Sequence, residues 1–148
     1  MTRRLVRPAD HRVMPWKNGG GSTAEIALAP EGADLATGFD WRLSIATIER
    51  DGPFSAFPGY DRTIMLIEGA GMVLDFGGGK AERIAVPFEP FEFVGEATVE
   101  CRLLGGRIRD FNLMVRRAGY GAECHVVELA DEPLALATDG GTLLIHCL

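Results

Sequence analysis

The 148-residue sequence lacks any long hydrophobic run and contains few cysteines. Apolar runs such as Ile64–Ile67 fall far short of the ~20 residues that a membrane-spanning helix needs. No apolar segment follows the basic start of the chain, so we expect no secretion signal. The three cysteines are odd in number and widely spaced, which favours a reducing compartment over a disulfide framework. These absences predict a soluble cytoplasmic protein that does not bind a membrane.

Positive charge is also scarce, since the formal net charge is −6. A general nucleic-acid binder needs a basic surface, so we expect no nucleic-acid partner. A local basic pocket remains compatible with this balance. Hydrophobic residues make up 47% and charged residues 24%, which are ordinary globular values. We therefore expect a single domain over residues 1–148, large enough to bury a substantial core.

Helical periodicity is missing as well: no segment keeps an apolar stripe for three turns, and Ala33–Thr37 allows one turn at most. Instead, short β-branched and apolar runs alternate with glycine-rich breaks such as Gly69–Gly71. This pattern predicts an antiparallel all-β sandwich or barrel and does not choose between them. The expected strands are Thr23–Ala29, Trp41–Glu49, Arg62–Glu68, Met72–Phe76, Glu82–Val86, Thr98–Leu104, Asp110–Arg116, Glu123–Leu129 and Thr142–Cys147.

Two of these strands alternate polar with apolar residues. In Trp41–Thr47, Arg42 and Ser44 share one face, because successive side chains on a strand point to opposite sides. In Asp110–Arg116, Asn112 lies opposite an apolar face in the same way. A carboxamide in an apolar strand must find a hydrogen-bond partner, which is either backbone or a ligand.

The segment Met14–Glu25 sets an aromatic, a cation and a carboxamide against three consecutive glycines. Glycine reaches positive φ freely, and successive backbone N–H groups can form an anion-binding nest. A phosphate loop, however, places its lysine after the glycines and leads into a helix. Two interpretations stay open: a tight entry loop capped by Trp16, or the lip of a binding site.

Four segments together resemble the HutD/Ves family of bacterial proteins: Met14–Glu25, Trp41–Ala46, Asp51–Arg62 and Asp110–Met114. The resemblance implies a cupin-like (RmlC-type) antiparallel β-barrel in a bicupin arrangement of two related modules. It places the first module at about 10–104 and a partial, shortened second module at about 105–148. It also implies a link to histidine utilisation or, for the Ves branch, to stress and cold.

The histidines argue against a metal centre. A metal-dependent cupin carries two histidines one residue apart and a nearby glutamate, whereas the matching stretch Phe57–Arg62 has no histidine. The pairs Cys124-His125 and His146-Cys147 tempt a zinc assignment, but neighbouring residues on a strand point to opposite faces and each pair offers one ligand. We expect no metal and no other cofactor.

Arg42 and Arg62 are the cations most suited to an interior site, because a guanidinium grips a carboxylate with two parallel hydrogen bonds. The alternative for each is a structural ion pair, with Asp40, Asp51 or Asp61 as partner. Phe54 is either a cover for the ligand's carbon skeleton or ordinary core.

We therefore predict a metal-independent, non-catalytic cupin that binds a small carboxylate, such as formylglutamate or urocanate, and regulates histidine utilisation. The predicted binding residues meet at one barrel mouth: Trp16, Lys17, Asn18, Gly19, Gly20, Arg42, Ser44, Phe54, Arg62 and Asn112. One alternative is a metal-free enzyme with Asp61 or Glu25 as acid–base, although the sequence shows no paired carboxylates or nucleophile triad. Another is an interaction module. A homodimer is the default oligomeric state.

Overall fold

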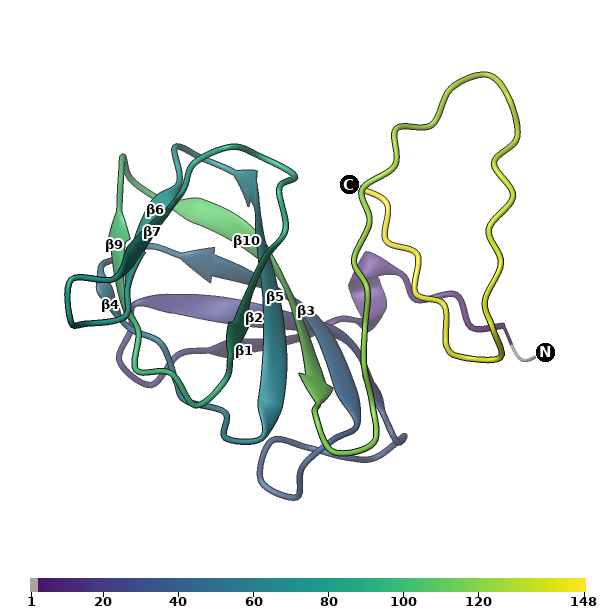
Figure 1. Ribbon diagram of the computed structural model, residues 1–148, viewed down its shortest axis with the longest axis horizontal. Coiled ribbons are helices and arrows are strands. Elements are labelled where there is room, and N and C mark those ends of the chain that lie inside the picture. Colours follow the sequence, from purple (N-terminus) through teal and green to yellow (C-terminus); the bar gives the residue numbers. More distant parts are fainter. Residues whose placement is uncertain (1–2) are drawn as a thin grey trace.

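The β-branched and apolar runs form ten antiparallel strands in the computed structural model, which describes residues 3–148 (Figure 1). A short 3-10 turn, η1 (Pro8–Asp10), is the one helical element of the described chain, and nothing in it is long and apolar enough to cross a membrane as a helix. The strands are β1 (Arg12–Pro15), β2 (Gly21–Ala29), β3 (Trp41–Ile48), β4 (Gly52–Pro53), β5 (Tyr60–Glu68), β6 (Met72–Asp75), β7 (Ala81–Ile84), β8 (Phe91–Val94), β9 (Glu100–Leu103) and β10 (Ile108–Arg116).

The strands build two sheets rather than one closed ring. The larger sheet has the order β1-β2-β3-β10-β5-β8, and the smaller has the order β4-β9-β6-β7. Figure 1 shows the smaller sheet lying against the left part of the larger one. The prediction of an antiparallel all-β, cupin-like fold is confirmed, in the form of two facing sheets.

The main core lies between the sheets. Ile48, Ile64 and Leu66 from the larger sheet meet Met72 and Leu74 from the smaller sheet, and all five are almost completely buried. A second apolar cluster covers the opposite, outer face of the larger sheet, and it includes Leu43, Ile45, Met65, Phe111 and Leu113. The central strands β3, β10 and β5 therefore bury side chains on both faces, which explains their nearly continuous hydrophobic sequences.

Turn chemistry at Gly69–Gly71 agrees with the prediction of a glycine-rich break between strands. Both glycines adopt positive φ, +102° at Gly69 and +103° at Gly71. A Cβ at Gly71 would stand 2.3 Å from the carbonyl oxygen of Ile84. Only glycine therefore allows β5 to turn into β6 so close to the end of β7.

Several predicted boundaries need correction. β1, β4 and β8 were not anticipated, and the predicted strands Glu123–Leu129 and Thr142–Cys147 have no regular secondary structure. Residues 117–148 contain neither helix nor strand, and Figure 1 shows most of them running beside the sheets as an extended loop. β10, which the prediction assigned to the second module, lies between β3 and β5 in the larger sheet. The division into two modules stays a prediction.

Candidate functional site

A set of polar side chains lies on the inner face of the larger sheet. The register places Glu25, Ser44 and Asn112 side by side across β2, β3 and β10. In the neighbouring row, Arg42 and Arg62 flank Met114. Arg42, Ser44, Arg62 and Asn112, all predicted from the sequence, are buried here, which agrees with the side-chain alternation on these strands.

Arg42 is already held by a partner on the next strand. Its Nε donates to Oε2 of Glu25 over 2.8 Å, and both side chains are nearly inaccessible. The ion pair is thus internal to the sheet, and its carboxylate is none of the three aspartates that the sequence suggested. Glu25 neutralises Arg42 and leaves Arg62 as the neighbouring buried cation.

Arg62 has only weak or neutral partners. Its Nη2 donates to Oδ1 of Asn112 over 3.0 Å, its Nη1 donates to the carbonyl oxygen of Ser55 over 3.4 Å, and its buried Nε has no partner. Burial lowers the pKa of Arg62 to about 10; the charge of Asp110 opposes this shift, and that of Arg42 adds to it. This guanidinium therefore has two neutral acceptors but none at Nε and no directly bonded carboxylate, which leaves a buried cation incompletely compensated.

Three aromatic rings surround the Arg62 guanidinium. Its Cζ lies 5.5 Å from the ring centroid of Phe54, 5.5 Å from that of Phe57 and 4.9 Å from that of Phe93. These distances permit cation–π attraction. Phe54 and Phe57 come from the loop between β4 and β5 and are half-buried, so this loop covers the guanidinium.

Asp110 completes the cluster, although the sequence analysis did not select it. Its Oδ2 accepts a hydrogen bond from Nδ2 of Asn112 over 3.0 Å, and its buried Oδ1 has no partner. Complete burial raises the pKa of Asp110 to about 7, against the opposing effects of Arg62 and the Asn112 hydrogen bond. The signal was present in the sequence, because Asp110 stands two residues from Asn112 on the same face of a strand.

The glycine-rich loop lies at the other end of the sheet. Gly21 pairs with Ile48 at one end of β3, whereas Leu28 pairs with Arg42 at the opposite end. Leu28 stands seven positions after Gly21 along β2, a span of roughly 23 Å. Among the described residues, the glycine-rich loop therefore does not meet Arg42 and Arg62 at one barrel mouth. The reason is that the hairpin between β1 and β2 turns at the end of β2 that lies away from Arg42.

The loop itself is a tight turn tied to the core. The Trp16 amide donates to the Gly21 carbonyl over 2.9 Å, and the Gly20 amide donates to Oδ1 of Asn18 over 2.8 Å. The Trp16 indole Nε1 donates to Oγ1 of Thr23 over 2.8 Å, and its ring packs against the main core. Lys17, Asn18 and Gly19 are exposed. Their role in ligand binding stays a prediction.

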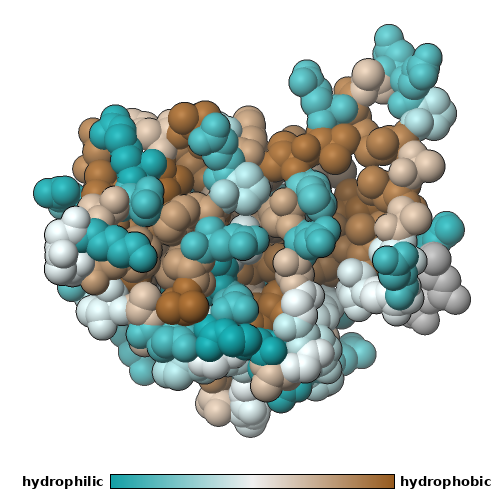
Figure 2. Space-filling view, in the orientation of Figure 1, coloured by the Kyte–Doolittle hydropathy of each residue, from teal (hydrophilic) through white to brown (hydrophobic). Residues whose placement is uncertain are grey.

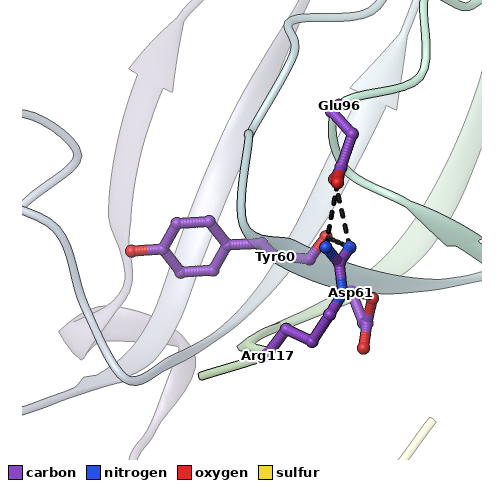
Figure 3. A network of polar contacts seen from close by, with 4 residues as sticks. All are labelled: Tyr60, Asp61, Glu96 and Arg117. Atoms are coloured by element: carbon purple, nitrogen blue, oxygen red, sulfur yellow. Dashed lines mark hydrogen bonds and ion pairs between the residues drawn. The ribbon is translucent and has the colours of Figure 1, made fainter.

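An exposed ionic network anchors the end of the loop that covers Arg62, where that loop leads into β5 (Figure 3). The two amino groups of Arg117 bind the Glu96 carboxylate over 2.9 and 3.1 Å, and its Nε donates to Asp61 over 2.8 Å. Hydrogen bonds to Arg117 lower the pKa of Glu96 to about 2. The Arg117 amide also donates to the Gly59 carbonyl over 2.9 Å. The network thus joins the end of β10 to the turn that precedes β5.

We expect Arg117→Ala to loosen that turn without unfolding the sheets. The amide protons of Phe57 and Tyr60, which bond to Gly95 and Phe57 across the turn, should exchange faster with solvent. Hydrogen exchange followed by mass spectrometry measures this. Arg109→Ala is the matched control, since that exposed arginine pairs with Glu68 at the other end of the sheet. Equal protection of the turn in both variants would contradict the expectation.

Two surface hollows lie away from Arg62. One opens between the outer face of the larger sheet and the C-terminal segment, and its lining includes Leu43, Phe111, Cys124 and His146. Figure 2 shows hydrophobic side chains gathered where the projecting C-terminal segment meets the rest of the molecule. The other is small and lies beside Asp51 and Arg102. Within residues 3–148, no three histidine, cysteine, aspartate or glutamate side chains are grouped so that they could hold a metal ion.

Two facing antiparallel sheets with a polar cluster in their core define an all-β, cupin-like protein. The solved structure of KdgF from a Halomonas species supports this class, with a TM-score of 0.56 over 78% of this chain and 96% of that chain. At 18% identity the likeness concerns the fold alone.

The chain belongs to the HutD family, which it matches over residues 8–148. It is 51% identical over 119 residues to an uncharacterized 21.2 kDa protein in the hutC 3' region of Pseudomonas putida, covering 80% of this chain and 60% of that protein. It is 38% identical over 123 residues to protein Ves of Cronobacter sakazakii, covering 80% and 65%. The predicted resemblance to the HutD/Ves family is confirmed.

Among solved structures, HutD from Pseudomonas fluorescens SBW25, in a formate condition, matches with a TM-score of 0.67 and 50% identity, over 74% of this chain and 58% of that chain. This chain thus spans less than two thirds of the length of these relatives.

Proposed function

We propose that this chain binds a small carboxylate at Arg62, without a metal, and that this binding regulates histidine utilisation. The observation that carries the proposal is the burial of Arg62, a residue with 6% exposure, whose Nε has no partner and whose other guanidinium contacts are a carboxamide and a backbone carbonyl. Unlike Arg42, it has no directly bonded carboxylate. A ligand carboxylate supplies the missing acceptor.

The shape of the guanidinium indicates how the ligand is held. Nε and Nη2 lie on the same edge of the group and present parallel N–H bonds, the arrangement that a carboxylate fits best. The rings of Phe54, Phe57 and Phe93 already surround Arg62 and offer apolar surface to the rest of a small acid. The long contact to Ser55 is the protein's weakest hydrogen bond at this group, so the loop that carries Ser55 is the part that yields on entry.

Formylglutamate and urocanate are the proposed ligands. Each carries a carboxylate beside a polar group, and each belongs to histidine breakdown. The name of the P. putida relative, which refers to the hutC 3' region, supports the pathway. The cytoplasm, where the three unpaired thiols would stay reduced, is the proposed compartment.

Titration calorimetry with formylglutamate and urocanate tests the proposal. We expect the unaltered protein to bind one of them and Arg62→Lys to weaken binding by about tenfold or more, because lysine keeps the charge and loses the two-pronged hydrogen bond. Arg107→Lys is the matched control, since Arg107 is exposed and pairs with Glu68. Absence of binding by the unaltered protein, or equal binding by Arg62→Lys, would contradict the assignment.

The enzyme alternative gains no support from the described residues. Asp61 is exposed on the outside of β5 and bonded to Arg117, while Glu25 is bonded to Arg42. Neither carboxylate is free to move a proton for a substrate at Arg62.

The interaction-module alternative is favoured by one observation on the opposite side of the larger sheet. Apolar side chains of the C-terminal segment, among them Leu129 and Ile145, are largely exposed beside the apolar hollow. This second candidate function concerns a different face and does not compete with binding at Arg62.

A further inference from the structure

We propose that binding of an anion at Arg62 is coupled to the uptake of one proton by Asp110, through rotation of the Asn112 carboxamide. The inference rests on the proposed carboxylate binding at Arg62 and adds a pH-dependent control to it. Its basis is the chain of side chains Arg62–Asn112–Asp110, in which each member is buried and each hydrogen bond has a fixed direction.

The ligand-free arrangement is one that a carboxylate disturbs. Asn112 turns its Oδ1 toward Nη2 of Arg62 and its Nδ2 toward Oδ2 of Asp110. A carboxylate seated on the Nε and Nη2 edge of Arg62 brings an acceptor next to Oδ1, which is itself an acceptor. Two acceptors without a proton between them repel each other.

Rotation of the carboxamide by half a turn removes this conflict. Nδ2 then donates to the incoming carboxylate, but Oδ1 faces Oδ2 of Asp110. That second contact is favourable only if Asp110 is protonated and donates its O–H to Oδ1. One proton from solvent therefore joins Asp110 as the ligand joins Arg62. The hydrogen bonds of Asn112 are exchanged, and no covalent bond other than the new O–H forms or breaks.

The charge balance of the buried cluster leads to the same result. Arg42 and Glu25 neutralise each other directly, and Arg62 is balanced by ionised Asp110 across Asn112. A bound carboxylate adds one negative charge in a region where an uncompensated charge is costly. A proton on Asp110 restores neutrality.

Asp110 is the group best placed to accept that proton. The titratable or charged groups around it are Arg62 on β5, Arg42 on β3, Glu25 on β2 and Cys101 on β9, with exposed Asp51 and Glu100 near Cys101. The pKa of Cys101 is raised to about 12 by burial, so its thiol already holds a proton. Glu25 is bonded directly to Arg42 over 2.8 Å. Asp110 has the free oxygen and a pKa of about 7.

Titration calorimetry with formylglutamate tests the coupling, because the carboxyl groups of that acid remain ionised at neutral pH. In buffers of different ionisation enthalpy, the unaltered protein should take up close to one proton per ligand at about pH 8 and close to none at about pH 6. Its Kd should be about tenfold weaker at the higher pH. Asp110→Asn, which carries a permanently neutral group of the same shape, should bind with one Kd at both pH values and without proton uptake. Glu68→Gln, at an exposed carboxylate of the other sheet end, should behave like the unaltered protein.

Binding with equal Kd at both pH values and no proton uptake would overturn the coupling and leave carboxylate binding intact. Retention of the pH dependence in Asp110→Asn would also overturn it. If neither the unaltered protein nor Asp110→Asn binds formylglutamate at either pH, the coupling is wrong for this acid. If urocanate does not bind either, the proposed carboxylate binding is wrong as well. If Asp110→Asn does not fold, the number of protons that the unaltered protein takes up per ligand at the two pH values is the test of the coupling.

Discussion

Replacement of Arg42 by methionine should lower the free energy of unfolding by about 3–5 kcal/mol, because it leaves Glu25 buried without its partner. The Glu25 and Arg42 side chains are 10% and 5% exposed, so water cannot take the place of the lost guanidinium. Methionine fills much of the volume of the arginine stem, which limits the cavity contribution. Urea denaturation followed by fluorescence of the two tryptophans measures the effect.

The double variant Glu25→Leu with Arg42→Met separates an unpaired charge from a packing defect. Removing both charges should recover most of the lost stability, since an apolar pair of similar size replaces a buried ion pair at little cost. Arg109→Met is the matched control, because its exposed pairing with Glu68 should contribute only about 0–1 kcal/mol. A double variant as unstable as Arg42→Met alone would show that the unpaired charge is not the cause.

The second large effect concerns the dependence of stability on pH. Burial raises the pKa of Asp110 from an ordinary value of 3.8 to about 7, so the folded state holds this proton more tightly than the unfolded chain does. This group therefore contributes stability at low pH that is lost as the pH rises from about 4 to 7. A shift of about three units corresponds to roughly 4 kcal/mol.

Asp110→Asn should remove this contribution. Denaturant unfolding at about pH 4 and about pH 8 measures the free energy of unfolding of both proteins. From the lower to the higher pH, the unaltered protein should lose roughly 4 kcal/mol more of this free energy than the variant does. Glu68→Gln serves as the control and should give a profile parallel to that of the unaltered protein. Parallel profiles for Asp110→Asn would mean that Asp110 keeps an ordinary pKa in the folded protein.

Most of the fold follows from the sequence because side-chain alternation and glycine breaks are local properties. Strands β2, β3, β5 and β10 were predicted within two residues of their bounds, and so were β6, β7 and β9. β4 was missed because it has two residues, and β8 because Pro90 and two intervening glutamates obscure its pattern. The segments Glu123–Leu129 and Thr142–Cys147 have the composition of strands. A strand also needs another strand with which its backbone can pair, and neither segment pairs with one in the two sheets.

The site was harder to predict because it depends on which strands become neighbours. Alternation placed Arg42, Ser44 and Asn112 on inner faces correctly, since that inference needs one strand at a time. The expected convergence with Lys17 and Gly19 required the register of β2 against β3, which local sequence does not contain. Glu25 as the partner of Arg42 became visible only when β2 was paired with β3, whereas Asp110 lies on the same strand and face as its partner Asn112 and could have been selected from alternation alone.

The central position of β10 has a consequence for how the chain reaches this structure. β3 and β5 each pair with β10 along almost their whole length, yet they leave the ribosome well before it. Until β10 arrives, both carry open edges, and Arg62 lacks its contact with Asn112 and, through it, with Asp110. Long-range antiparallel pairing of this kind slows folding and exposes strand edges to other chains. The newly made chain thus has a period of vulnerability to aggregation that lasts at least until β10 takes its place between β3 and β5.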